Sequence, residues 1–145
     1  MGEELRIFKL IKEIHKENQK KCNKAMADEG LKITKPQLDI MVYLKENQDR
    51  EINAKNIEED FHLTNPTVAG FLNRLEKKQL IQKKKSEKGF KYKAIELTKK
   101  GEELLEAIQK RGMNFTLLAL KDIPKEDLIT IANTLEKILV NIQKN

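Results

Sequence analysis

Tryptophan is absent from this sequence, and cysteine, proline and glycine are scarce, with one, three and six residues among 145. So few glycines and prolines exclude a β-sandwich or barrel, which needs many tight turns. The lone Cys22 cannot form an internal disulfide. No apolar run approaches the roughly 20 residues that span a bilayer, and the first residues lack the cationic start and apolar core of a signal peptide. We expect a cytoplasmic protein without membrane contact.

Sequence patterns that carry catalysis or hold metals are missing as well. The chain has no Gly-rich phosphate loop, nucleophile motif or paired-carboxylate signature. Two histidines and one cysteine without ligand spacing argue against zinc. We therefore expect no enzyme, no cofactor and no metal. Cys22 lies among lysines, and nearby cations favour the reactive thiolate. A peroxide-sensing role for Cys22 stays open, although an ordinary cysteine is the favoured interpretation.

The positive charge, by contrast, is abundant and concentrated. The net charge is +6, and the segment 64–93 alone holds nine Lys or Arg against two acids, a charge of +7. The rest of the chain carries −1. Such a focus attracts a polyanion, because neutralised phosphates release counterions. The alternative is a solvated lysine surface, but the concentration of charge favours nucleic acid.

Apolar residues at helical spacing predict helices over most of the chain. The first covers residues 3 to about 29, and the second follows Thr34, whose capping box includes Gln37. Glu51 and Ile52 could form a short strand before a helix over 54–60, capped by Asn53. Thr64 or Asn65 caps the next helix, which ends near residue 78, and two more helices follow Thr98 and Pro124. Gly112 could kink or interrupt the helix that follows Thr98.

Two alternating segments, 80–85 and 92–97, flank a polar tip at 86–89 and predict a β-hairpin. The helix pair before it matches a helix-turn-helix. Five lysines near the hairpin tip could reach phosphates or the minor groove, namely Lys83, Lys84, Lys85, Lys88 and Lys91.

The helix over 65–77 has the two faces that a DNA-reading helix needs. Val68, Phe71, Leu72 and Leu75 form its apolar stripe. The other face begins with small and polar residues and ends in cations, so it suits the DNA major groove. The candidate DNA-binding residues there are Thr64, Asn65, Pro66, Thr67, Ala69, Gly70, Asn73, Arg74 and Lys77. Gly70 is either simply tolerated or needed for close approach of the helix backbone to DNA.

Four segments in order, ITKPQ at 33–37, LTNPTV at 63–68, LEKKQLI at 75–81 and LTKKG at 97–101, resemble the landmarks of MarR-type transcription regulators. The resemblance covers almost the whole chain. It implies a winged helix-turn-helix protein that binds a pseudo-palindromic operator as a homodimer, as a repressor, and responds to a small-molecule effector. The chain departs from the family pattern at Gln79, where glycine is usual, at Gly70, and in the wing at 89–91, where Lys91 takes the place of an arginine.

We thus predict a mainly α protein with a small β-wing, forming one domain over 1–145. The DNA-binding region would span about 34–98, and helices at about 3–30 and 99–143 would pair two subunits. Their apolar stripes could be ordinary core, but a chain of this length offers little to cover them. Two further hypotheses remain open. One is a winged-helix protein-interaction module without DNA binding, and the other is a nonspecific nucleic-acid binder.

Overall fold

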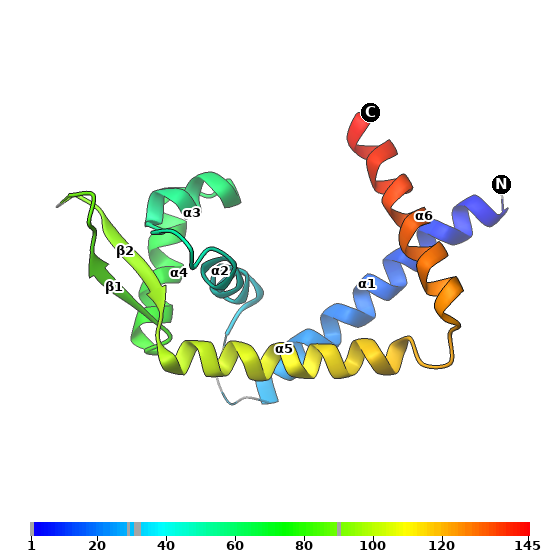
Figure 1. Cartoon of the computed structure of the whole chain (residues 1–145), viewed down its shortest axis with the longest axis horizontal. Coiled ribbons are helices and arrows are strands. Elements are labelled where there is room, and N and C mark those ends of the chain that lie inside the picture. The colour runs from blue at the N-terminus through cyan, green and yellow to red at the C-terminus, as the bar shows by residue number, and fades with distance from the viewer. Residues whose placement is uncertain (1, 29, 31–32, 90) are drawn as a thin grey trace. The chain divides into compact units, whose positions relative to one another are not determined.

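The computed structural model describes residues 2–28, 30, 33–89 and 91–145. Within them lie six helices and one two-stranded antiparallel sheet: α1 Gly2–Asp28, α2 Lys35–Glu46, α3 Ala54–Phe61, α4 Asn65–Lys77, β1 Ile81–Lys85, β2 Lys93–Leu97, α5 Lys99–Ala119 and α6 Lys125–Lys144 (Figure 1). The predicted mainly α fold with a β-wing is confirmed. The chain divides into two compact units, one ending at Gly112 and one from Met113 to Asn145.

Side-chain caps set the starts of α2 and α3, as the sequence predicts. The Gln37 amide donates to Thr34 Oγ1 and the Thr34 amide to Gln37 Oε1, both at 3.4 Å. Asn53 and Asn56 make the same reciprocal pair at 2.9 Å. Each box satisfies amides that the first helical turn would leave unpaired. The two boxes therefore fix where α2 and α3 begin.

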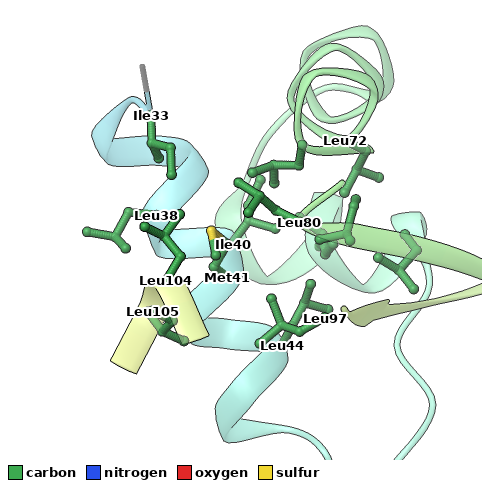
Figure 2. Packing of buried hydrophobic residues seen from close by; sticks show 14 of the residues in the cluster. Ile33, Leu38, Ile40, Met41, Leu44, Leu72, Leu80, Leu97, Leu104 and Leu105 are labelled. Carbon is green, nitrogen blue, oxygen red and sulfur yellow. The ribbon is translucent and has the colours of Figure 1, made fainter. Parts of the chain in front are cut away.

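The core of the first unit joins the helix-turn-helix to the base of the hairpin. The apolar stripe of α4 is confirmed, since Val68, Leu72 and Leu75 are buried and Phe71 is half-buried. They pack with residues from α2, the hairpin base and α5, among them Ile40, Met41, Leu80, Leu97 and Leu105, as Figure 2 shows for the labelled residues. Each such burial contributes about 1.5 to 3 kcal/mol. This core holds α4 against α2 and α3 with its other side outward.

The hairpin has a simple register, in which Ile81 lies opposite Leu97 and Lys85 opposite Lys93. Gly89 takes φ +133° in the tip, a conformation that side chains rarely adopt. At the hairpin base, the Thr98 amide donates to the Leu80 carbonyl at 3.0 Å. Thr98 Oγ1 donates to the Gln79 carbonyl at 2.6 Å and accepts from the Gly101 amide at 3.0 Å. Thr98 thus caps α5, as predicted, and also ties α5 to the end of α4.

Four details differ from the sequence-based expectations or lie outside the described residues. The segment at Glu51 and Ile52 is not a strand, because among the described residues it shares one backbone hydrogen bond with the hairpin, from the Ile95 amide to the Ile52 carbonyl at 2.7 Å. The helix after Thr98 runs through Gly112 without interruption to Ala119, because a single glycine leaves the backbone hydrogen bonds of a helix intact. Residue 29, the expected end of the first helix, lies outside the described residues, as does Phe90 of the wing.

The terminal helices carry apolar side chains that the single chain leaves exposed. Of the 27 residues of α1, Met26 is buried, whereas Leu5, Phe8 and Ile14 are 65%, 48% and 67% exposed. None of the 20 residues of α6 is buried. Exposed apolar rows of this kind are typical of an interface with a partner.

Candidate nucleic-acid interface

The outward side of α4 presents the residues that the sequence selects for base reading. Asn65, Ala69, Asn73, Arg74 and Lys77 are all exposed. Arg74 and Lys77 lie in the last turn, where cations interact favourably with the helix dipole. The face therefore combines amide groups, which can hydrogen-bond to base edges, with cations that suit guanine or phosphate.

The first turn of α4 is exposed and partly held in place by side-chain hydrogen bonds. Thr64 stands at the N-cap position, as predicted, but its side chain makes no capping hydrogen bond, and Pro66 lies in the first turn. The Thr64 and Thr67 hydroxyl oxygens are 2.9 Å apart, and Asn65 Nδ2 donates to Glu58 Oε2 on α3 at 3.3 Å. The Asn65 amide is thus oriented by α3, while all four residues at this helix start remain accessible.

Gly70 sits on the same side of α4 and is half-buried. A Cβ added there would lie 3.6 Å from Arg74 Nη1, which is ordinary contact. Nothing inside the described chain therefore requires glycine at this position. The helix nevertheless bears the cost of an interior glycine, about 1 kcal/mol relative to alanine.

The lysines of the hairpin divide between its two faces, since side chains alternate along a strand. Lys83 pairs across the sheet with Ile95, whereas Lys84 pairs with Ala94 on the opposite face. Lys84 Nζ lies 2.7 Å from Glu96 Oε1, and this hydrogen bond holds the pKa of Glu96 below its usual range. Lys83 Nζ approaches Glu76 of α4, at 3.9 Å. The structure therefore brings Lys83 to α4 and places Lys84 on the other face.

A hollow of about 820 Å³ lies between α3, α4 and the hairpin. Its lining includes Asn65 and Ala69 from α4 and Lys83 and Lys91 from the hairpin. Two further lysines, Lys55 and Lys93, also line it, and neither was among the candidate residues. Lys93 could have been selected from the sequence, because the predicted hairpin places it opposite Lys85. Lys55 could not, because it comes close to the hairpin only through the packing of α3. The remaining wing candidates, Lys85 and Lys88, are exposed nearer the tip.

Gln79 has a left-handed backbone, with φ +61°. The residue follows α4, where its amide donates to the Glu76 carbonyl at 2.9 Å and the next amide, of Leu80, to Leu75 at 3.0 Å. These bonds close the helix end in the manner that normally favours glycine. The family's usual glycine at this position therefore has a local physical reason.

Three further features that the sequence raises are Cys22, metal binding and membrane crossing. Cys22 is half-buried against the core, and its peroxide-sensing role stays a hypothesis. Across residues 2–28, 30, 33–89 and 91–145, no three His, Cys, Asp or Glu side chains are placed to hold a metal ion. None of the helices in those ranges combines the length and apolar character that crossing a membrane requires.

Comparison with known proteins agrees with this geometry. Residues 20–108, more than half of the chain, match the family described as transcriptional regulator SarA/Rot. No curated protein matches the sequence significantly. Three solved structures of MepR from S. aureus each align with 92% of this chain: a point mutant (25% identity, TM-score 0.80, 96% of that chain), a DNA complex (26%, 0.75, 97%) and a form bound to ethidium bromide (26%, 0.72, 94%).

YusO from Bacillus subtilis shares the fold at 20% identity, with a TM-score of 0.77 and 92% of each chain aligned. The expected resemblance to MarR-type winged-helix regulators is confirmed. The family and these structural neighbours are transcription regulators, not enzymes. With its helix-turn-helix, basic wing and matched segment, this chain belongs to the SarA/Rot family of transcriptional regulators.

Proposed function

We propose that the protein regulates transcription by binding a pseudo-palindromic operator in duplex DNA as a homodimer. The observation that carries the proposal is the hollow in which the outward side of α4 meets the lysines of the hairpin. A helix face of this kind fits the major groove, and a cationic hairpin beside it can follow the adjacent backbone or minor groove. The DNA complex of MepR, similar over 92% of this chain, supports the same assignment.

The candidate residues take different roles in this proposal. Asn73 and Arg74 read base edges, while Ala69 and Gly70 allow the helix backbone to approach them. Thr64, Asn65, Pro66 and Thr67 place the helix start, and Lys77 contacts phosphate. In the wing, Lys83, Lys85, Lys88 and Lys91 contact phosphates or enter the minor groove, and Lys84 contributes least because it lies on the other face, paired with Glu96.

The homodimer accounts for the exposed apolar rows of the terminal helices. Large apolar side chains are exposed on α1, at the end of α5 and on α6, including Leu5, Leu117 and Leu139 at 65%, 64% and 55%. Pairing with a second copy would remove them from water, and a two-fold axis would set two α4 helices about 34 Å apart, one turn of DNA. Light scattering at micromolar concentration should give twice the mass of 16.9 kDa. A monomer would contradict this part of the proposal.

The direct test is fluorescence anisotropy of the purified protein with the duplex upstream of its own gene. A scrambled duplex is the control, and both are titrated across a salt series. Specific regulators favour their site by about 10³-fold or more, so we expect a preference of that order, weakened by Asn73→Ala or Arg74→Ala. Equal affinity for both duplexes would favour a nonspecific binder. No binding at low salt would favour the protein-interaction module, which the family assignment does not support.

Two lysine variants make a matched pair for the wing. Lys91→Ala and Lys84→Ala remove the same charge, but Lys91 lines the hollow and Lys84 is bonded to Glu96 on the other face. Each phosphate contact contributes about 0.9 to the slope of log affinity against log salt. Lys91→Ala should lower the magnitude of this slope by about 0.9, the value of one phosphate contact, and Lys84→Ala should lower it by much less. Equal effects would refute the assignment of the wing face.

The proposal also includes a small-molecule effector, a cytoplasmic location of the protein and repression as its effect on transcription. MepR has been solved with ethidium bromide, which supports a small-molecule effector here. A hollow of about 460 Å³ beside the end of α1, lined in part by Asn23, Met26 and Ile33, is a place where one could bind. We infer a cytoplasmic protein without catalytic activity that represses by occupying its operator. If this hollow controls release, ethidium should lower the anisotropy of the wild-type protein–DNA complex, and Asn23→Trp, which fills part of the hollow, should reduce that loss; intercalation of ethidium into the duplex would release both proteins alike.

A further inference from the structure

Glu51, in the connection between α2 and α3, contacts the tip of the wing 35 residues away. Its carboxylate accepts two hydrogen bonds, from the Ser86 hydroxyl to Oε2 at 2.8 Å and from the Glu87 amide to Oε1 at 3.0 Å. Ser86 Oγ in turn accepts from the Lys88 amide at 3.0 Å. Glu51 thus bonds Ser86 and Glu87 directly, and Lys88 is linked to it through the Ser86 hydroxyl.

These contacts have the features of a specific attachment. Ser86 is 8% exposed although it lies in the hairpin turn, and its hydroxyl is hydrogen-bonded to Glu51. Hydrogen bonds to a carboxylate are stronger than those between neutral groups. The Glu87 amide, the Ser86 hydroxyl and the charge of Lys88 lower the pKa of Glu51, which shows that the tip favours the ionised side chain.

The hairpin needs such an attachment because it is a short two-stranded sheet with little stability of its own. It has two strands of five residues each, and an isolated two-stranded hairpin is marginally stable in water. The core anchors its base through Ile81, Ile95 and Leu97, whereas Lys83, Lys84 and Lys85 are exposed along β1. Removing the Glu51 carboxylate would break the two hydrogen bonds that hold Ser86 and Glu87 to the segment before α3.

We propose that Glu51 is a positioning residue for DNA binding, which holds the wing tip so that Lys85, Lys88 and Lys91 reach the DNA together with α4. The inference rests on the DNA-binding function proposed above. It assigns an acidic residue a favourable role in binding a polyanion. By charge alone, removing a carboxylate near DNA should strengthen binding, so the sign of the effect separates positioning from electrostatics.

The matched experiment compares Glu51→Ala with Glu87→Ala, since both remove one negative charge from the same region. Only the backbone amide of Glu87 takes part in the attachment, so its side chain serves as the control. We expect Glu87→Ala to bind operator DNA slightly more tightly. Glu51→Ala should bind about tenfold more weakly. The slope of its log affinity against log salt should also be smaller, by about 0.9 for each of one to two lost phosphate contacts, although no lysine has been changed.

A second variant tests the same attachment without any change of charge. Ser86→Ala removes the hydroxyl bonded to Glu51, and we expect it to weaken binding and lower the salt slope as Glu51→Ala does. The double variant should bind no more weakly than Glu51→Ala, because both changes break one attachment. A urea midpoint close to that of the wild type would show that the helix-turn-helix of each variant is folded.

Two results would overturn the inference, and they differ in meaning. If the wild type binds operator DNA but Glu51→Ala binds it as tightly as Glu87→Ala with an unchanged salt slope, positioning is wrong and the DNA-binding function stands. If the wild type shows no salt-dependent DNA binding, the proposed function itself fails and the inference fails with it.

Discussion

Gly101 in the first turns of α5 should resist replacement even by alanine. A Cβ at this position would lie 2.1 Å from the carbonyl oxygen of Leu80 and 3.0 Å from its carbonyl carbon. Ordinary contact begins at 3.4 Å, so the two backbones would have to separate by about 1.3 Å. The same Leu80 carbonyl accepts the Thr98 amide at 3.0 Å, and this separation would strain or break that hydrogen bond.

The expected loss follows from three opposing effects. Alanine is favoured over glycine inside a helix by about 1 kcal/mol. Overpacking of a tight contact costs about 1 to 3 kcal/mol, and the lost hydrogen bond about 1 kcal/mol more. Gly101→Ala should therefore lower the free energy of unfolding by about 1 to 3 kcal/mol. Because Leu80 connects α4 to the hairpin, the change would also loosen the base of the wing.

Gly112→Ala is the matched control on the same helix. A Cβ at Gly112 would meet nothing within 4 Å, so alanine should stabilise the protein by up to about 1 kcal/mol. Urea unfolding followed by circular dichroism, at one protein concentration for all variants, would measure both effects. If Gly101→Ala proved as stable as the wild type, the close approach of α5 to Leu80 would be wrong.

Four further outcomes are expected. Gln79→Gly should raise the free energy of unfolding by about 0.5 to 1 kcal/mol, because φ at this position is +61° and side chains disfavour the left-handed region; an unchanged urea midpoint would contradict this. Gly70→Ala should stabilise the fold, since its Cβ makes only ordinary contact, and yet weaken operator binding in the anisotropy assay; undiminished affinity would show that α4 does not need the glycine for close approach. Leu139→Glu should give a monomer by light scattering, because it places a charge on the exposed apolar row of α6; a persistent dimer would exclude that row from the interface. Glu96 has a pKa below the ordinary 4.5 because of its bond to Lys84, so its contribution to stability is present above pH 4.5 and lost as the pH falls through the lowered value; the difference in urea midpoint between wild type and Glu96→Gln should disappear in the same range.

Local patterns in the sequence determined most of the secondary structure. Thr34 and Asn53 cap helices because a side-chain oxygen can reach an amide three residues on, whatever the rest of the chain does. The apolar stripe of α4 follows from helical spacing, and the hairpin from alternation around a polar tip with Gly89. The family resemblance, with its ordered landmarks from residue 33 to 101, extended these local patterns to a winged helix-turn-helix.

Only the tertiary structure decided which of the lysines lie together and what holds the wing. Lys83 and Lys84 are neighbours in sequence, but the strand puts them on opposite faces, and Lys55 joins the hollow from a helix far along the chain. The bond from Ser86 to Glu51 joins residues 35 positions apart. The close approach of Gly101 to Leu80 joins α5 to the connection between α4 and β1. Such contacts depend on how the elements pack, because residues far apart in sequence carry no local signal of their separation in space. The sequence by itself thus determined the helices, the hairpin and the focus of charge, whereas packing of the core determined how that charge is presented.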